Sequence, residues 1–311
     1  MPQLSPVART LLDKINNSSA PKLHELSAVE ARQIYKKMAQ RSTPPTEAVA
    51  AICDYVCPNG DEGVPVRLYV PERLIATPGP AIAFVHGGGW VFGTIEDYDS
   101  FCCALAIRSE CRVVSIGYRL APEYPFPTAL RDVERALRWI LTDAATLSID
   151  PTRLGVVADS AGANLAIVVA QSSQPPLPIH IFALVYPATD FTMSHSSCVQ
   201  FSDGYLLTRA TMQWFLRQYL SSAVTPSDPR VSPLYGPAIP QLKHALIITA
   251  GFDPLRDEGH AFAEKLRQEG VDVVYNCYAD MIHGFITMGA IFNTADVALS
   301  GLAHWLTSKL R

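Results

Sequence analysis

The sequence predicts one large α/β domain, in which helices cover both faces of a mainly parallel β-sheet. From residue 80 onward, short apolar runs with strand character alternate with helical patterns, which is typical of parallel strands joined by crossover helices. A glycine-rich loop and a corner of small residues each follow one of these strands. The chain has 311 residues, of which 49% are hydrophobic, so it is long enough for one large domain with a lid or for two small domains.

The individual elements are predicted from turn residues and hydrophobic periodicity. Two helices are expected at Val7–Ile15 and Ala28–Met38, and two strands at Ala48–Val56 and Val64–Val70, with the turn-rich residues 58–63 between the strands. Beyond residue 80, strands are expected at 81–85, 112–116, 154–158, 179–186, 245–250 and 271–275, and helices at 98–109, 129–141, 258–268 and 295–310.

Residues 187–242 interrupt this alternation, because they contain many Pro, Ser and Asp and only one helical pattern, at Thr211–Tyr219. We expect this segment to be an insertion over the C-terminal edge of the sheet, together with residues 1–45. The core of the domain then consists of residues 46–186 and 243–311.

Composition excludes several classes of partner. The net charge of −4 gives no electrostatic basis for binding nucleic acid or a membrane surface. No apolar run reaches the length of a membrane span, and the N-terminus lacks the pattern of a secretory signal. The seven cysteines are odd in number and scattered, as expected for reduced thiols in a cytoplasmic protein. Cys53 and Cys57 are followed by no second Cys or His pair at zinc spacing, so no metal site is expected.

Residues 154–170 have the pattern of a strand, a tight corner and a buried helix, with Ser160 at the corner. This is the arrangement of a nucleophile elbow, in which small residues two before and two after the Ser let the strand and the helix approach closely. Ala158 replaces the first Gly of the usual pattern, and Gly162 supplies the second. An ordinary strand-to-helix turn with an N-capping Ser fits this stretch equally well, so both interpretations stay open here.

A glycine loop, residues 86–90 with the sequence HGGGW, directly follows the predicted strand 81–85. Three consecutive glycines leave their backbone N–H groups unshielded, so these groups can turn toward an anion. A flexible loop and a phosphate cradle are the alternatives, but a phosphate loop carries a Lys followed by Ser or Thr, and none follows here. The loop therefore favours an anion hole for a developing alkoxide.

Two late residues complete a candidate catalytic set. Asp253 comes just after a predicted strand, and His283 lies between the last strand and the last helix. Because loops after parallel strands converge on one edge of a sheet, Ser160, Asp253 and His283 can meet there. His283 would take the proton of Ser160 during attack, and Asp253 would hold the imidazole in the required tautomer. The rival acids Asp257 and Glu258 belong to a helix start, where carboxylates are favoured anyway.

With these residues in place, the sequence resembles the hormone-sensitive lipase family of α/β-hydrolases, which includes bacterial esterases and plant carboxylesterases. The resemblance covers roughly residues 80–290, although Ala158 and Ala163 stand where the family usually has Gly. Its motifs, in order, are HGGGW at 86–90, YRLAPE at 118–123, DSAG at 159–162, DPLRDEG at 253–259 and HGF at 283–285. The family's fold has a mainly parallel sheet and a helical cap, which residues 1–45 and 187–242 would form.

The resemblance implies hydrolysis of a carboxylic ester through an acyl-enzyme, without a metal or an organic cofactor. The implied triad is Ser160, Asp253 and His283. The implied oxyanion hole consists of the backbone N–H groups of Gly88, Gly89 and Ala161.

The expected substrate is a small ester with a short to medium acyl chain, because the sequence has no large interfacial apolar segment. A homodimer formed through edge strands or helices near the last strand is a further expectation. The residues expected to line the pocket under the cap are Trp90, Phe92, Tyr205, Trp214 and Phe215.

Other activities use the same framework. Amide or lactone hydrolysis needs the same triad and is the nearest alternative. The family also includes small-molecule receptors, which typically lose the catalytic His, and lyases, which tend to alter the nucleophile. Both His283 and Ser160 are present in this chain, which favours hydrolysis.

Overall fold

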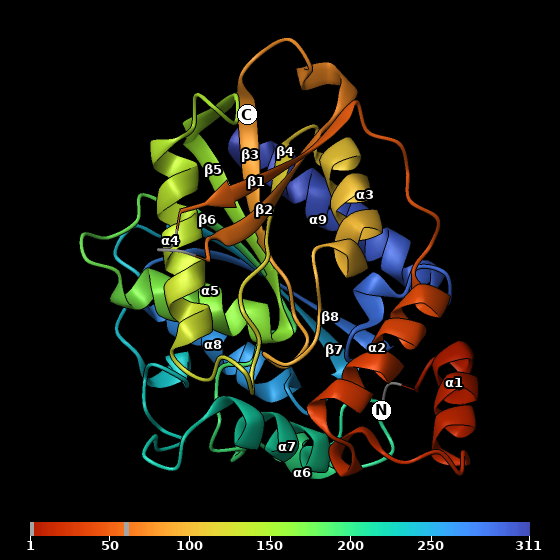
Figure 1. Ribbon diagram of the computed structural model, residues 1–311. Coiled ribbons are helices and arrows are strands. Elements are labelled where there is room, and N and C mark those ends of the chain that lie inside the picture. The colour runs from red at the N-terminus through yellow and green to blue at the C-terminus, as the bar shows by residue number, and fades with distance from the viewer. Residues whose placement is uncertain (1–2, 59–61) are drawn as a thin grey trace.

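The central strands of the sheet form from apolar, often β-branched runs, most of whose residues are buried. They are β3 (Gly79–Val85), β4 (Arg112–Ile116), β5 (Ile149–Asp159), β6 (Ile181–Val185) and β7 (His244–Phe252). In the computed structural model, which describes residues 3–58 and 62–311, these strands are parallel and belong to one eight-stranded sheet (Figure 1). Helices cover both faces of this sheet, so the predicted α/β class is confirmed.

The sheet has the order β1-β2-β4-β3-β5-β6-β7-β8. At one edge, β1 (Ala51–Cys57) and β2 (Val64–Val70) form an antiparallel pair, and β2 is antiparallel to β4. The turn expected between β1 and β2 falls partly on residues 59–61, which lie outside the described residues. At the other edge, β8 (Asp272–Ile282) runs parallel to β7. The strands from β3 to β8 therefore end on the same side of the molecule.

The covering helices form two layers. On one face, α4 (Thr128–Thr142), α5 (Ser160–Ser172) and α8 (Arg256–Gln268) belong to one apolar cluster. On the other face, α3 (Asp99–Ser109) and α9 (Asn293–Leu310) belong to a second cluster (Figure 1). The apolar residues Val133, Ala136, Leu137 and Ile140 recur every three to four positions on α4, and all of them are buried on one face of the helix.

Four further helices gather at the end of the molecule where the parallel strands finish. They are α1 (Pro6–Asn16), α2 (Ala28–Ser42), α6 (Ser196–Gln200) and α7 (Arg209–Tyr219), which we call the cap helices (Figure 1). α2 begins at a capping box, in which Ser27 accepts the N–H of Glu30 and the Glu30 carboxylate accepts the N–H of Ser27. Helices from both of the segments expected to form a cap, the N-terminal one and the insertion at 187–242, thus lie together.

Several predicted boundaries were wrong in ways that matter for the site. β8 continues to Ile282 rather than ending at residue 275, so His283 directly follows the strand. β5 begins at Ile149, five residues early, and α6 was not predicted. Short 3-10 helices occur at Leu23–Glu25, Glu72–Leu74, Glu96–Tyr98, Pro233–Tyr235 and Phe285–Thr287. Among the described residues, no helix is both long and apolar enough to cross a membrane.

Candidate active site

The corner between β5 and α5 places Ser160 in a strained conformation. β5 ends at Asp159, α5 begins at Ser160, and Ser160 has a φ of +52°, a left-handed value that costs a non-glycine residue about 1–3 kcal/mol. A Cβ at Gly162 would overlap the backbone oxygens of Val85 and His86, so glycine is required there. Ala158, the last residue but one of β5, is fully buried, and it belongs to the apolar cluster that also contains residues of α4, α5 and α8.

Ser160, His283 and Asp253 form one hydrogen-bonded chain. Asp253 directly follows β7 and is completely buried. Its Oδ2 lies 2.7 Å from His283 Nδ1, and its Oδ1 accepts the N–H of Leu255 at 2.9 Å. The Oγ of Ser160 lies 3.0 Å from His283 Nε2. Because a carboxylate only accepts hydrogen bonds, Nδ1 carries the imidazole proton, and the Nε2 lone pair is free to take the proton of Ser160.

The glycine loop lies beside Ser160. Gly88 and Gly89 have φ values of +106° and +61°, which only glycine adopts readily. A Cβ on Gly88 would overlap the carbonyl of Phe92, and one on Gly89 would overlap the ring of Phe215. Both glycines line a cavity together with Ser160 and Ala161. Ala161 is the second residue of α5, so its N–H has no acceptor within the helix.

His86 braces this loop rather than acting as a base. Its ring stacks on Tyr118 at 4.3 Å, and its Nδ1 lies 2.8 Å from the carbonyl oxygen of Gly87. Burial lowers the pKa of His86 to about 4, so the ring is neutral at physiological pH. The hydroxyl of Tyr118 donates to the carbonyl oxygen of His86 at 2.8 Å, which ties the loop to the YRLAPE segment.

Asp159 links the elbow to the glycine loop. Its Oδ1 accepts the N–H of Gly87 at 2.7 Å, and the hydroxyl of Tyr98 lies 3.5 Å from Oδ2. Burial raises the pKa of Asp159 to about 7, although the Gly87 hydrogen bond and the charge of His283 act in the opposite direction. The residue before the nucleophile therefore fixes the start of the candidate oxyanion loop.

Arg32 of α2 fastens the far end of the glycine loop. Its guanidinium donates to the carbonyl oxygens of Val91 and Ala121, each at 2.8 Å, and forms a two-bond ion pair with Glu123. A planar guanidinium suits this arrangement, because it presents several donors in fixed directions. One cap helix is thus bonded directly to the loop beside Ser160.

The cavity at this site has a volume of about 200 Å³, and three of the five residues that were expected to line the pocket lie in its wall. Trp90, Phe92 and Phe215 line it, together with Ser160 and His283. Within the part of the chain that the structure describes, Tyr205 and Trp214 lie outside its wall, so these two predictions were wrong. The indole of Trp214 donates to the carbonyl oxygen of Leu26 at 3.2 Å, and Tyr205 stacks on Phe252. Both aromatic side chains pack within the cap or against the sheet end.

Other wall residues were missed, although helical spacing gives a signal for most of them. Tyr35, Met38, Ala39 and Ser42 of α2 recur at three- and four-residue intervals, and all line the cavity. Met212, Phe215 and Leu216 repeat the pattern on α7. A stripe of this kind marks one face of a helix, so the cavity lies between the inner faces of α2 and α7.

The family is shown by comparison with known proteins. A family model described as the alpha/beta hydrolase fold matches residues 82–287. The ethyl acetate hydrolase of Pseudomonas putida is 36% identical over 293 residues, covering 93% of this chain and 92% of that protein. The carboxylic ester hydrolase LipN of Mycobacterium tuberculosis is 37% identical, covering 84% of this chain and 71% of its own. This chain belongs to the hormone-sensitive lipase family of α/β-hydrolases.

Solved structures agree with this family assignment. An ester hydrolase from the metagenome of Lake Arreo, complexed with a bipyridine phosphonate derivative, superposes with a TM-score of 0.94 at 35% identity and covers 98% of this chain and 99% of that one. A hyperthermophilic esterase from the archaeon Pyrobaculum calidifontis gives a TM-score of 0.90 at 33% identity, with 98% of each chain covered. The similarity therefore includes the cap helices as well as the sheet.

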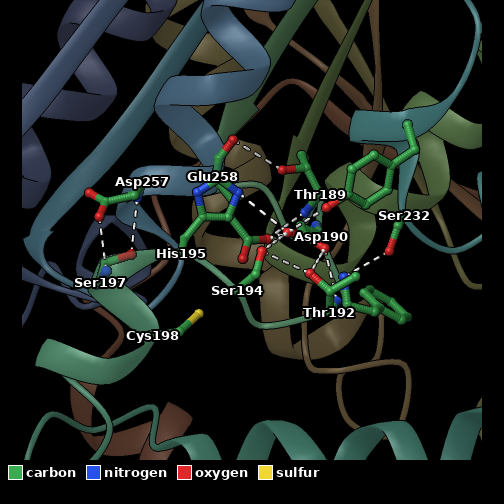
Figure 2. Close-up of polar contacts among 12 residues, drawn as sticks. Thr189, Asp190, Thr192, Ser194, His195, Ser197, Cys198, Ser232, Asp257 and Glu258 are labelled. Atoms are coloured by element: carbon green, nitrogen blue, oxygen red, sulfur yellow. Dashed lines mark hydrogen bonds and ion pairs between the residues drawn. The ribbon is translucent and has the colours of Figure 1, made fainter. Parts of the chain in front are cut away.

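This hormone-sensitive lipase family member also has a polar cluster around Asp190 and Glu258 (Figure 2). Asp190 accepts hydrogen bonds from Thr192, Ser194 and Tyr235 and lies 3.3 Å from His195 Nε2. Burial opposes ionisation of Asp190, but these partners outweigh it and hold the pKa of its carboxyl below the usual range. Asp190 and the neighbouring Glu258 both line the cavity, and no sequence pattern indicates that Glu258 is buried.

Proposed function

We propose that this chain hydrolyses carboxylic esters with short to medium acyl chains, through a Ser160–His283–Asp253 triad and an acyl-enzyme intermediate. Carboxylic ester hydrolysis is the activity of the named relatives and defines the class of enzyme. The observation that supports the finer proposal is the unbroken hydrogen-bonded chain from Asp253 through His283 to Ser160, at 2.7 and 3.0 Å.

Acylation follows from this geometry. As the Oγ of Ser160 attacks the ester carbonyl carbon, its proton moves to His283 Nε2, and a tetrahedral alkoxide forms. The N–H groups of Gly88, Gly89 and Ala161 donate to that oxyanion, and loss of one such donor typically costs about 3–4 kcal/mol. His283 then gives its proton to the departing alcohol oxygen, which leaves the acyl group on Ser160.

Deacylation repeats the same steps with a water molecule as the nucleophile. His283 Nε2 takes a proton from a water molecule as the water oxygen attacks the acyl carbon, and the second alkoxide uses the same three N–H groups. When this intermediate collapses, the proton returns from His283 to the Oγ of Ser160, and the carboxylic acid leaves. Asp253 stabilises the imidazolium in both halves of the reaction without itself becoming protonated.

The size of the cavity supports short and medium acyl chains. Its volume of about 200 Å³ lies below the roughly 300–1,000 Å³ that is typical of pockets for drug-sized ligands. One relative is named for hydrolysis of ethyl acetate, a small ester. The cap helices, contributed by residues 1–45 and 187–242, would close the cavity over the substrate.

A fluorophosphonate probe provides the central test. It should label Ser160 in the wild type and fail to label Ser160→Ala or His283→Ala, as read by mass spectrometry of the modified peptide. The wild type should also cleave a short-chain aryl ester faster than the matched amide or lactone. Undiminished ester cleavage by Ser160→Ala would refute the proposal, and faster turnover of the amide or lactone would replace it with the nearest alternative.

A cytoplasmic location and a homodimer stay predictions of the sequence and of the family resemblance. Fractionation of the native host and light scattering of the purified protein test them separately from the chemistry.

A further inference from the structure

Glu258 is a buried carboxyl group for which the triad chemistry has no use. It lies in the first turn of α8, is completely buried, and lines the cavity that contains Ser160. Its Oε1 accepts two backbone N–H groups, from Thr189 at 2.6 Å and from Asp190 at 3.1 Å. Its Oε2 has no hydrogen-bond partner among the residues that the structure describes. Within the described residues, only one of the two carboxyl oxygens of Glu258 therefore takes part in hydrogen bonds (Figure 2).

The environment determines where the acidic proton of Glu258 lies. Burial raises its pKa well above the usual range, and the charges of Asp190 and Asp253 raise it further, although the two N–H donors lower it. The net shift favours the neutral, protonated form of the carboxyl group. Because Oε1 already accepts two hydrogen bonds, the proton resides on Oε2. An O–H donor is therefore left without an acceptor on a residue of the cavity wall, which also contains apolar residues such as Leu255 and Phe191.

The other carboxyl group nearby has no comparable free atom. Both oxygens of Asp190 are hydrogen-bonded, Oδ1 to Thr192 and Oδ2 to Ser194 and Tyr235. A buried donor without an acceptor costs about 1–3 kcal/mol. A ligand that brings an acceptor atom to Glu258 would remove this cost.

We propose that Glu258 is a specificity-determining residue, whose Oε2–H donates a hydrogen bond to a second oxygen of the substrate, outside the ester group. The preferred substrates are then esters that carry an ether, carbonyl or hydroxyl oxygen on the acyl or the alcohol side. The inference rests on the proposed ester hydrolysis and names the substrate class of the same site. It extends the apolar pocket expected from the sequence by one polar contact.

Isosteric substrates test this directly. On the acyl side, 4-nitrophenyl methoxyacetate is compared with 4-nitrophenyl butyrate, and on the alcohol side, 2-methoxyethyl acetate is compared with butyl acetate. Each ratio of kcat/KM is divided by the ratio of the alkaline hydrolysis rates, which removes the difference in intrinsic reactivity. In one of the two pairs, the wild type should prefer the oxygen-bearing ester by roughly 3- to 10-fold, the value of one net hydrogen bond.

Two variants and one control separate recognition from structural support. Glu258→Gln keeps an acceptor for the two N–H groups and presents an N–H donor to the cavity, so its corrected ratio should stay within about twofold of the wild type. Glu258→Met removes the donor, and its ratio should fall to about one. Glu264→Met, at a half-exposed position on the same helix that is not among the residues lining the cavity, should leave the ratio unchanged.

Each outcome decides the question. If Glu258→Met slows both esters of a pair equally, Glu258 only supports the backbone, and the proposal is overturned. A corrected wild-type ratio near one in both pairs overturns it as well, even if Glu258→Met does not fold. A wild-type preference that Glu258→Gln retains supports it. Failure of the underlying function looks different, because the wild type would then cleave neither ester of a pair, or Ser160→Ala would cleave both.

Discussion

Replacing Asp253 by Asn should abolish most activity because the structure fixes the orientation of the new amide. The N–H of Leu255 points at Oδ1 from 2.9 Å, so the amide oxygen must occupy that position. The amide nitrogen then faces His283 Nδ1 at the 2.7 Å position of Oδ2, and two donors would meet there. The imidazole relieves the conflict by moving its proton to Nε2, where it points at Ser160 and cannot act as a base.

The expected loss is about 10⁴-fold in kcat, as in other triads that are forced into the wrong tautomer, which corresponds to about 5.5 kcal/mol of barrier. KM for a short-chain aryl ester should change little, because Asp253 does not contact the substrate. The control is Asp257→Asn four residues later, which keeps its acceptor for the N–H of Ser197 and should cost less than a few-fold. If Asp253→Asn loses less than about 30-fold while its melting temperature is unchanged, the tautomer argument is wrong. A larger loss in the Asp257 variant would make that residue the triad acid.

Three further predictions concern the elbow and the pocket. Burial raises the pKa of Asp159 to about 7, above its unfolded value of about 3.9. The stabilising contribution of the protonated carboxyl group is therefore complete at low pH and is lost as the pH rises through 7. Urea denaturation should show that Asp159→Asn removes about 2–3 kcal/mol of the decline in unfolding free energy between pH 5 and 8. Ala158→Gly should retain or raise kcat while it lowers stability by about 1–2 kcal/mol, from the lost buried methyl group and the freer unfolded backbone; a large fall in kcat would show that the methyl group is needed at the elbow. Phe215→Ala opens the cavity wall beside the glycine loop and should move the acyl-chain optimum of 4-nitrophenyl esters to longer chains, whereas Trp214→Ala, outside the wall, should destabilise the protein without moving that optimum.

The sequence predicts the sheet well because the central strands are apolar runs with clear turn residues between them. It also places Ser160, Asp253 and His283 after strands, and the C-terminal ends of parallel strands lie on one edge. The structure brings these three side chains within hydrogen-bond distance of one another. The extension of β8 up to His283 was missed, because its alternating pattern contains exposed polar residues typical of an edge strand.

The cavity wall was harder to predict because neighbouring residues on a helix point about 100° apart. Trp214 and Phe215 are adjacent on α7, yet only Phe215 lines the cavity. An aromatic composition alone cannot distinguish the two, and the register of the helix against the sheet is set by tertiary packing. Glu258 was likewise read as a helix-start carboxylate, because its burial depends on the backbone of Thr189 and Asp190, nearly 70 residues earlier.

The bonds of Arg32 affect how far this scaffold can be recombined with its relatives. Exchanging the N-terminal helices is an obvious route to chimeras with new substrate ranges, since the cap covers the cavity. The interface between the two parental parts of such a chimera would include the contacts of Arg32. Its acceptors Val91, Ala121 and Glu123 would all belong to the other parent. A graft that lacks a matching arginine leaves two carbonyl groups and one carboxylate next to the glycine loop without their donor. Donor helices should therefore be chosen by this contact before they are chosen by the shape of the pocket.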